Sequence, residues 1–331
     1  MRRILVTAIS GDIGNGILKI LKQSQNCVLL GCDVNDIAVG MDMVSVFWKC
    51  KYATEDGYIE ELLDKCTLHH ITHLIPVNER EIEIISKFRY AFTALNIRLV
   101  IQSDELLQIC LDKYNTAMFL QKHGFQTPTT YSTPDQLPEN SGRYICKPRK
   151  SNGSKNIFLF EKKEDLYQTD LENCIFQNYI DSTNEYTIGV FRHNNLINIL
   201  AFKRELKNGY SNKVELVHDT GLYDLAEQLA LAFSLDGYFN IQLREKDGVY
   251  FIFEINPRIS GTVRFRDMLG FHDVLWWLDL LDAKKPTQYV CPYSCAVGVR
   301  ELNEKFLILK DKKREHTNES SFSNRMDTGN R

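Results

Sequence analysis

Short apolar runs alternate with amphipathic segments over about the first 105 residues, and this alternation is the feature that most restricts the fold. The apolar runs predict strands at residues 4–9, 27–32, 72–77 and 97–101. The segments between and after them predict helices near residues 14–25, 57–66, 79–95 and 103–110. Strands and helices that alternate in this way form a parallel sheet with crossover helices. The first part of the chain therefore predicts an open α/β unit.

A second region begins near Asp112, where the pattern changes. Residues 112–123 have helical periodicity, and Gly124 lies where a left-handed residue commonly ends a helix. A turn-rich stretch then leads into a small lobe, which we expect to contain strands at 144–147, 157–160 and 174–179 and a helix from Lys163. Beyond the lobe we expect two hairpins separated by a helix, with strands at 185–191, 196–204, 237–244 and 249–255 and the helix at 222–234.

The composition is that of an ordinary globular protein with no bias toward a polyanionic partner. Hydrophobic residues make up 44% and charged residues 25%, and the formal net charge is −3. No stretch approaches the roughly 18 apolar residues that a membrane span needs. The nine cysteines include no C-x-x-C pair, which is typical of reduced thiols in a cytosol. We therefore expect a cytoplasmic protein that binds neither nucleic acid nor a membrane.

The strongest chemical signal lies on the last two predicted strands. Gln242 lies on one strand, and Glu254 and Asn256 lie on the next, just before Arg258. Residues of like parity on neighbouring antiparallel strands face the same side, so these three oxygen donors can converge. Hard oxygen ligands suit magnesium, which typically shares its shell with phosphates and water. A polar end of the sheet with Arg258 in a salt bridge is the alternative interpretation.

A basic loop follows the predicted strand that ends at Lys147. The loop runs to Lys155 and contains Gly153 and Ser154. Backbone N–H groups in such a loop, together with lysine and serine side chains, can surround phosphate oxygens. For this loop taken alone, a solvated surface turn is the alternative.

A series of motifs runs along the chain: Asp112-Lys113, Lys147-Pro148 with its glycine-containing loop, Gln177-Asn178-Tyr179-Ile180, Glu185-Tyr186-Thr187, Gln242 and Glu254-Ile255-Asn256-Pro257-Arg258. Their order and spacing resemble the ATP-grasp superfamily, most closely its carbamoyl-phosphate-synthetase large-chain-like carboxylate–amine ligases. Each motif is weak alone, but the series is specific. The likeness extends over nearly the whole chain, to about residue 300.

The resemblance implies an α/β fold in which a Rossmann-like domain at residues 1–108 precedes an ATP-grasp domain at residues 109–305. The small lobe, at about 127–180, would be a mobile lid, and residues 306–331 would be a largely disordered tail. The implied reaction joins a small carboxylate to an amine through an acyl phosphate, with ATP and Mg²⁺ or Mn²⁺ as cofactors and with release of ADP and phosphate. A homodimeric assembly is left open.

The resemblance also implies which residues hold the nucleotide. Lys113 and Lys147 would contact its phosphates, with Gly153 and Ser154 of the basic loop beside them. Glu185 would accept from the ribose hydroxyls. The adenine edge would lie against a hinge formed by Gln177, Asn178, Tyr179 and Ile180. The backbone groups of Asn178 and Ile180 would bind it.

The remaining implied roles concern the metal and the reacting groups. Gln242, Glu254 and Asn256 would hold the cation. Arg258 would stabilise charge on the transferring phosphoryl group or on the acyl phosphate. Lys203 and Arg204 would clamp the substrate carboxylate, and the alternative is that they are exposed charges at the end of a strand.

Departures from the family pattern keep a second function open. Gly153 is the one glycine in a loop that often has two or three, and Gln242 and Asn178 stand at positions that are carboxylates in many relatives. A nucleotide-binding scaffold without catalysis is therefore an alternative.

Three glycines after the first predicted strand keep a third function open. Gly11, Gly14 and Gly16 have the spacing G-x-x-G-x-G rather than the dinucleotide fingerprint G-x-G-x-x-G. An NAD(P)-dependent sugar reductase or epimerase is the enzyme class that this spacing would fit. We prefer the interpretation in which these glycines let a helix pack tightly on the strand.

Overall fold

The computed structural model describes residues 1–24, 27–138, 142–150, 156–162, 165–166, 171–301, 305 and 307. The helix expected from Lys163, the loop residues Gly153 and Ser154, and the chain beyond residue 307 lie outside the described residues. The chain forms two compact units, which we describe separately. The first contains residues 1–101 and 277–284, and the second contains residues 102–276 and 285–300.

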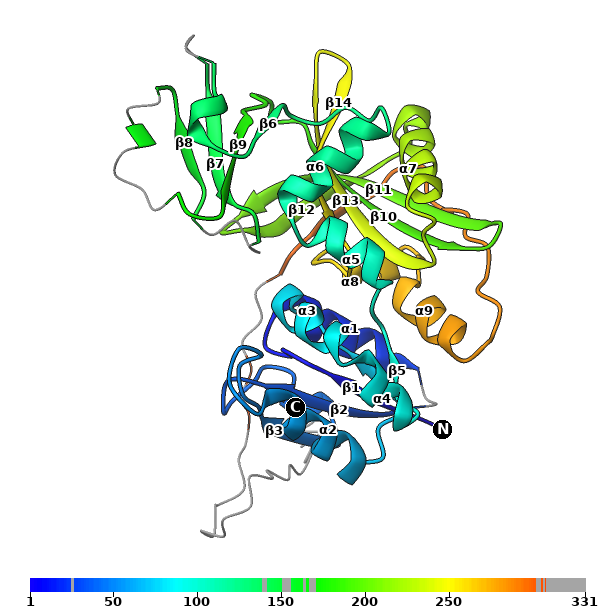
Figure 1. The fold of residues 1–331 in the computed structure, drawn as a ribbon. Helices are drawn as coiled ribbons and strands as arrows, with labels where there is room; N and C mark the ends of the chain where they lie inside the picture. The colour runs from blue at the N-terminus through cyan, green and yellow to red at the C-terminus, as the bar shows by residue number, and fades with distance from the viewer. Residues whose placement is uncertain are drawn as a thin grey trace. The chain divides into compact units, whose positions relative to one another are not determined.

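The first unit is built on a parallel sheet with the strand order β3-β2-β1-β4-β5. The predicted parallel sheet with crossover helices is confirmed (Figure 1). Its elements are β1 (Arg2–Val6), α1 (Asp12–Gln23), β2 (Cys27–Asp33), η1 (Met41–Met43), β3 (Val46–Lys49), α2 (Tyr58–Leu68), β4 (His73–Ile75), α3 (Glu79–Lys87), α4 (Arg89–Ala94) and β5 (Arg98–Leu99).

Two features of this unit differ from the expectation. The edge strand β3 was not predicted, because its four residues are too few to show a period. The single helix expected over residues 79–95 is two helices, which meet at Phe88. No glycine or proline marks that break in the sequence.

Gly14 has a packing role in the turn after β1. A Cβ atom at this position would lie 2.5 Å from the carbonyl oxygen of Ala8. Such a contact is too short for any side chain, so α1 can approach the turn this closely only with glycine here. The preferred interpretation of the glycines, as a packing requirement, is supported at this position.

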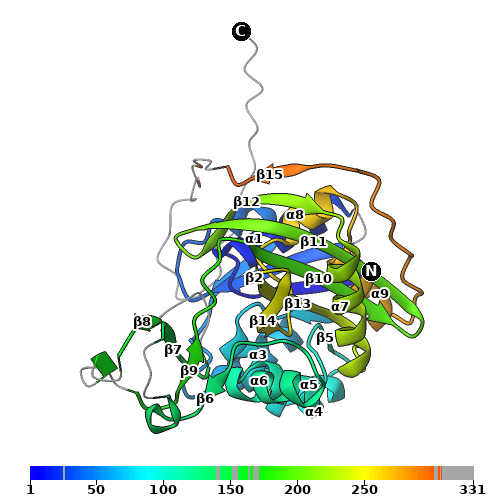
Figure 2. The same cartoon turned by 90° about the horizontal axis from the view of Figure 1, so that it is seen from above.

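The second unit contains a six-stranded antiparallel sheet with the order β14-β13-β10-β11-β12-β15 (Figure 2). Its strands are β10 (Glu185–His193), β11 (Leu196–Lys207), β12 (Tyr210–Val217), β13 (Gly237–Lys246), β14 (Val249–Asn256) and β15 (Val297–Val299). The helices of the unit are α5 (Asp104–Cys110), α6 (Lys113–Lys122), α7 (Thr220–Ala232), α8 (Val263–Met268) and the first part of α9 (Asp273–Leu281). Both predicted hairpins are present, whereas β12 and β15 were not predicted.

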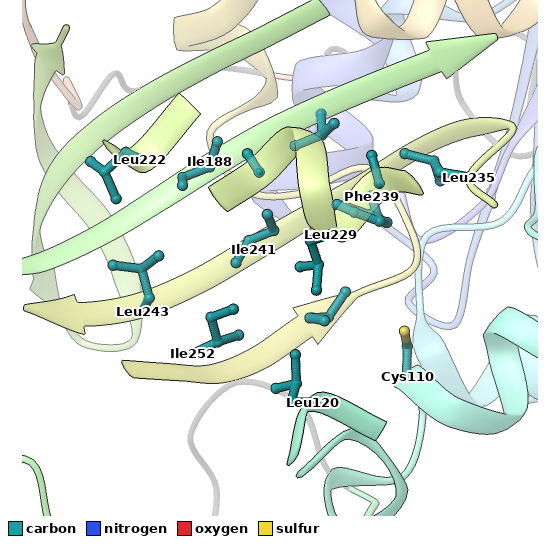
Figure 3. Packing of buried hydrophobic residues seen from close by; sticks show 14 of the residues in the cluster. Cys110, Leu120, Ile188, Leu222, Leu229, Leu235, Phe239, Ile241, Leu243 and Ile252 are labelled. Carbon is teal, nitrogen blue, oxygen red and sulfur yellow. The ribbon is translucent and has the colours of Figure 1, made fainter. Parts of the chain in front are cut away.

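One face of this sheet forms the core of the second unit. Side chains of α5, α6 and α7 pack against those of β10, β11, β13 and β14. Figure 3 shows Leu222 and Leu229 of α7 beside Ile188, Ile241 and Ile252 of the strands. Because side chains alternate along a strand, the residues between these apolar ones point to the opposite face. That opposite face carries Gln242 and Glu254.

The small lobe of the second unit is a four-stranded sheet with the order β6-β9-β7-β8. Its elements are β6 (Thr130–Tyr131), η2 (Pro134–Gln136), β7 (Tyr144–Pro148), β8 (Phe158–Phe160) and β9 (Cys174–Asn178). Tyr144, Cys146, Phe160 and Phe176 are part of its own buried core. Among the helices that the structure describes anywhere in the chain, none combines the length and apolar character that a membrane span needs.

An ionic cluster fastens residues 277–284 to the parallel sheet of the first unit. Asp282 accepts from Arg2 Nε (2.7 Å), and its other oxygen lies 3.0 Å from His73 Nε2 and 3.4 Å from Arg98 Nη1. Asp279 accepts only from Arg2 Nη2 in the same cluster (2.6 Å). Burial raises the pKa of Asp282, but the hydrogen bond from Arg2 and the neighbouring positive charges together lower it below its usual value.

We predict that Asp282→Asn lowers the free energy of unfolding by about 2 kcal/mol, because it weakens several charged hydrogen bonds at once. Asp279→Asn, which removes one contact, should cost less. Urea denaturation at pH 7 measures both. Since the folded-state pKa of Asp282 lies below its usual value of about 3.9, the effect should persist down to about pH 4 and shrink below it. Equal losses for the two variants would contradict the assignment.

Candidate functional site

A cavity of about 150 Å³ lies in the second unit, between the small lobe and the polar face of the six-stranded sheet. Most of the predicted site residues line it: Lys113, Lys147, Gln177, Asn178, Tyr179, Ile180, Glu185, Arg204, Gln242 and Glu254. Lys203, Asn256 and Arg258 are not part of its lining. Residues from five separate stretches of sequence therefore converge on one cavity.

An ion pair joins α6 to the end of β7 and thereby brings two lysines to the cavity. Asp112 caps α6 by accepting from the backbone of Tyr114 (2.9 Å). Its carboxylate also pairs with Arg149 (Nη2 to Oδ2, 2.8 Å), and the backbone N–H of Lys113 donates to the Arg149 carbonyl (2.9 Å). Lys147 lies on β7, two residues before Arg149, which follows the end of that strand. The sequence did not reveal this role of Arg149, which looked like one more charge in a basic loop.

Lys147 is a buried cation. Its side chain is 4% exposed, and Nζ donates to the Phe253 carbonyl at 3.4 Å. Burial lowers the pKa of Lys147 to about 8, with Lys113 and Arg244 acting in the same direction and Glu254 opposing them. A buried ammonium group with so few acceptors is prepared to bind an anion in the cavity.

Two backbone groups of the hinge, residues 177–180, already form hydrogen bonds within the protein. The N–H of Asn178 donates to the Thr129 carbonyl (3.0 Å), and the carbonyl of Ile180 accepts from Arg244 Nη1 (3.1 Å). The Asn178 N–H and the Ile180 carbonyl are therefore already engaged within the protein. The Tyr179 ring lies between the guanidinium groups of Arg143 (4.8 Å) and Arg244 (5.4 Å).

The side chain of Gln177 is held in one orientation. Its Nε2 donates to Thr130 Oγ1 (2.8 Å), and that hydroxyl donates to the Pro128 carbonyl (2.8 Å). A hydroxyl has a single proton, so Thr130 can only accept from Gln177. The amide oxygen of Gln177 is therefore turned away from Thr130 and remains an acceptor.

Glu185 is already bonded to two arginines. Oε1 accepts from Arg204 Nε (2.9 Å) and Nη2 (2.7 Å), and Oε2 accepts from Arg244 Nε (3.0 Å). A ribose would have to compete with these bonds, so the predicted ribose contact of Glu185 stays a prediction.

Lys203 and Arg204 do not form a joint clamp in this structure. Successive residues of a strand point to opposite faces. Arg204 lines the cavity, whereas Lys203 Nζ donates to Asn184 Oδ1 (2.7 Å) outside the cavity lining. Of the two predicted substrate contacts, only Arg204 is therefore placed to reach a ligand in the cavity.

The predicted metal ligands lie on one face, because a bulge at Phe253 brings Gln242 opposite Glu254. Gln242 is paired directly with Glu254 across β13 and β14, and Asn240 is paired with Asn256. Among the described residues, no donor reaches the carboxylate of Glu254. Asn256 is 3% exposed, and its Nδ2 has no partner in the part of the chain that the structure describes. The side-chain oxygen of Gln242 accepts from Arg204 Nη2 (2.9 Å), whereas no donor among the described residues reaches the side-chain oxygens of Glu254 or Asn256.

This donor set suits a hard cation that brings ligands of its own. In the described residues, no group of three or more His, Cys, Asp or Glu side chains could hold a metal. A cation would therefore depend on the Glu254 carboxylate, on amide oxygens and on ligands from a bound molecule. Magnesium in nucleotide sites is bound in this way.

A buried ion pair supports the loop that carries Arg258, and no sequence pattern indicated it. Arg266 pairs with Asp273 (Nη2 to Oδ2, 2.5 Å), and both residues are fully buried. Arg266 Nη1 also donates to Ser260 (2.8 Å) and Thr262 (2.6 Å). The pair thereby fixes the loop that follows β14, in which Arg258 donates to the Ile259 carbonyl.

We predict that Glu254→Gln moves the pKa of Lys147 below about 8, because the carboxylate stabilises the ammonium form that burial destabilises. NMR titration of lysine side chains labelled with ¹³C measures this pKa, and Lys147→Arg identifies the resonance by removing it. Glu227→Gln, on the exposed side of α7, is the control and should leave the titration unchanged. An unchanged pKa in Glu254→Gln would show that the two groups do not interact.

Comparison with known proteins supports one family. The sequence profile of a family described as the ATP-grasp domain matches residues 110–262. No curated protein sequence matches the chain. Several solved structures match in fold.

The N5-carboxyaminoimidazole ribonucleotide synthetase of Thermus thermophilus is 13% identical, with a TM-score of 0.72 over 91% of this chain and 84% of its own. The L-amino acid ligase of Bacillus licheniformis is 14% identical, with a TM-score of 0.68 over 87% and 75%. The biotin carboxylase domain of Hydrogenobacter thermophilus 2-oxoglutarate carboxylase, solved with MgADP, ADP and bicarbonate, is 12% identical, with a TM-score of 0.70 over 86% and 70%. Residues 110–262 therefore match the ATP-grasp domain family, and the fold of most of the chain is that of these solved structures.

Proposed function

We propose that the protein is an ATP-dependent carboxylate–amine ligase that works through an acyl phosphate. The observation that carries this proposal is the single cavity into which the chain brings two lysines, a backbone hinge and an open carboxylate on a polar sheet face. The superfamily supports it, since the similar Hydrogenobacter thermophilus domain was solved with MgADP. No nucleophilic side chain is required, because phosphoryl transfer depends mainly on positioning and charge neutralisation.

The nucleotide would lie along the cavity from the hinge to the lysines. The Asn178 carbonyl and the Ile180 N–H would bind the adenine edge, and the Gln177 amide oxygen lies nearby as a further acceptor. Lys147 and Lys113 would neutralise phosphate charge. Gly153 and Ser154, outside the described residues, are proposed to add contacts to the phosphates.

The metal would be held by Glu254 and Asn256, with Gln242 as the third member of the predicted set. When bound, a magnesium ion would supply charge neutralisation on the phosphate oxygens. No donor among the described residues reaches the carboxylate of Glu254 or the side-chain oxygen of Asn256, which is consistent with this role. Across the strand pair, Asn240 offers an unpartnered Oδ1 among the described residues, beside Asn256.

The chemistry would proceed in two displacements. A carboxylate oxygen of the substrate attacks the γ-phosphorus of ATP, and ADP leaves. An amine then attacks the acyl carbon, phosphate leaves with the bonding electrons, and the amine loses a proton to give the amide. Arg258 would stabilise the charge that develops on the phosphoryl group, and Arg204 would contact the substrate carboxylate through Nη1.

We predict that Lys147→Ala and Glu254→Ala each reduce ATP turnover by at least about 100-fold, because each removes charge stabilisation from the transferring group. ADP release with Mg²⁺ and a panel of small carboxylates and amines is the measurement. Lys122→Ala and Glu227→Ala are exposed substitutions of the same types and should keep the parent rate.

The same assay separates the alternative functions. Stabilisation of the parent by ATP and Mg²⁺ without turnover on any substrate pair would favour a nucleotide-binding scaffold. Stabilisation by NAD(P) instead of ATP would favour a reductase. Parent-like turnover in Glu254→Ala or Lys147→Ala would show that the site is elsewhere.

We also predict that the affinity for ATP falls above about pH 8. The free protein loses the Lys147 proton as the pH rises through about 8, but the phosphate-bound lysine must be protonated. Above that pH the dissociation constant should rise roughly tenfold per pH unit. Calorimetric titration between pH 6.5 and 9.5 tests this, and Lys147→Arg, which stays charged, should remove the dependence. A constant affinity across this range in the parent would refute it.

A further inference from the structure

Arg204 occupies the space beside one of the predicted metal ligands. Its Nη2 donates to the side-chain oxygen of Gln242 at 2.9 Å. That oxygen is the atom with which Gln242 would bind a cation. Gln242 is paired directly with Glu254 across the two strands, so the guanidinium lies next to the predicted metal site.

The guanidinium of Arg204 is held firmly in that position. It also donates through Nε (2.9 Å) and Nη2 (2.7 Å) to one oxygen of Glu185, and both side chains are 10% exposed. Glu185 is fixed in turn by Arg244, which donates from Nη1 to the Ile180 carbonyl in the hinge. Moving Arg204 away from Gln242 would therefore break several charged hydrogen bonds, which are among the stronger ones in proteins.

A divalent cation and this guanidinium would compete for the same oxygen. Like charges repel strongly in a partly buried site, where water screens them poorly. Glu254 and Asn256 differ from Gln242, because no donor among the described residues reaches the Glu254 carboxylate or the Asn256 side-chain oxygen. Of the three predicted metal ligands, Gln242 is therefore already bonded to Arg204, whereas Glu254 and Asn256 are available to a cation.

We propose that Arg204 takes the place of a second divalent cation beside Gln242, so that the site binds a nucleotide with one cation, on Glu254 and Asn256. This inference rests on the proposed function. The fixed guanidinium supplies positive charge to the polyphosphate without being a metal ion, and the site then needs fewer metal ions from solution. Gln242 acts here as a positioning residue for Arg204 rather than as a metal ligand.

The test counts Mn²⁺ ions bound per nucleotide. The protein, in excess over the non-hydrolysable analogue AMP-PNP, is dialysed to equilibrium against Mn²⁺, and the bound ion is counted by electron paramagnetic resonance. We expect one Mn²⁺ per nucleotide for the parent. Arg204→Met, which keeps the length of the side chain but removes its charge, should bind two. Arg244→Met is the matched control, because it removes the other arginine on Glu185 but not the one on Gln242, and should still bind one.

The outcomes separate this inference from the proposed function. Two Mn²⁺ ions per nucleotide in the parent would overturn the role of Arg204 while leaving the nucleotide site in place. A single ion in a folded Arg204→Met protein would overturn it as well. If Arg204→Met does not fold, the number of Mn²⁺ ions per nucleotide in the parent and in Gln242→Met decides. Gln242→Met should still bind one ion, and loss of that ion would show that Gln242 is a metal ligand. Failure of the parent to bind AMP-PNP would overturn the proposed function itself.

Discussion

The pairing of β13 with β14 is the constraint on which the rest of the second unit depends. Along β13, apolar residues at every second position pack under α5, α6 and α7, and on β14 a bulge at Phe253 places both Ile252 and Ile255 in the same core. The side chains between these apolar residues point to the opposite face of the sheet. A shift of one residue in register would bury Gln242 and Glu254 in the apolar core. The stability of the core and the placement of the polar groups therefore depend on the same strand register.

Charge on that polar face is balanced by fixed partners. Among the described residues, the cavity is lined by four cationic side chains, Lys113, Lys147, Arg204 and Arg244, and by two carboxylates, Glu185 and Glu254. Glu185 is bonded to both arginines, which leaves the lysines and Glu254 at the end of the cavity where phosphates would lie. The excess of positive charge and the burial that lowers the pKa of Lys147 both favour a polyanionic ligand. The Asp112–Arg149 pair then has a functional consequence, because it holds the two lysine-bearing elements together.

Much of this arrangement could be predicted from local patterns. The parity of Gln242, Glu254 and Asn256 suggested one face, but the turn at Lys246-Asp247-Gly248 alone would pair Gln242 with Phe253. A bulge at Phe253, which the sequence did not reveal, brings Gln242 opposite Glu254. The same parity rule could have separated Lys203 from Arg204. The strand expected at residues 174–179 and the helix expected at residues 112–123 were marked by their own sequence signals, and both lie where they were expected.

Other features depend on contacts between segments that are distant in the sequence. The bonds from Arg204 to Glu185 and Gln242 require the strand order β13-β10-β11, which is not the order along the chain. The Arg266–Asp273 pair joins residues that look like ordinary surface charges until the loop after β14 is folded around them. Strand β12 was missed because its polar residues do not alternate cleanly with apolar ones, and β3 because it is short.

The central claim is that one cavity binds the nucleotide between the lysines and the strand-borne oxygen donors. A crystal structure with ADP and Mn²⁺, phased near the manganese absorption edge, tests it most directly. The account predicts an anomalous peak at Glu254 and Asn256, with phosphates between that peak and the side chains of Lys113 and Lys147. A nucleotide bound in any other place, or a peak away from these two strands, would contradict it.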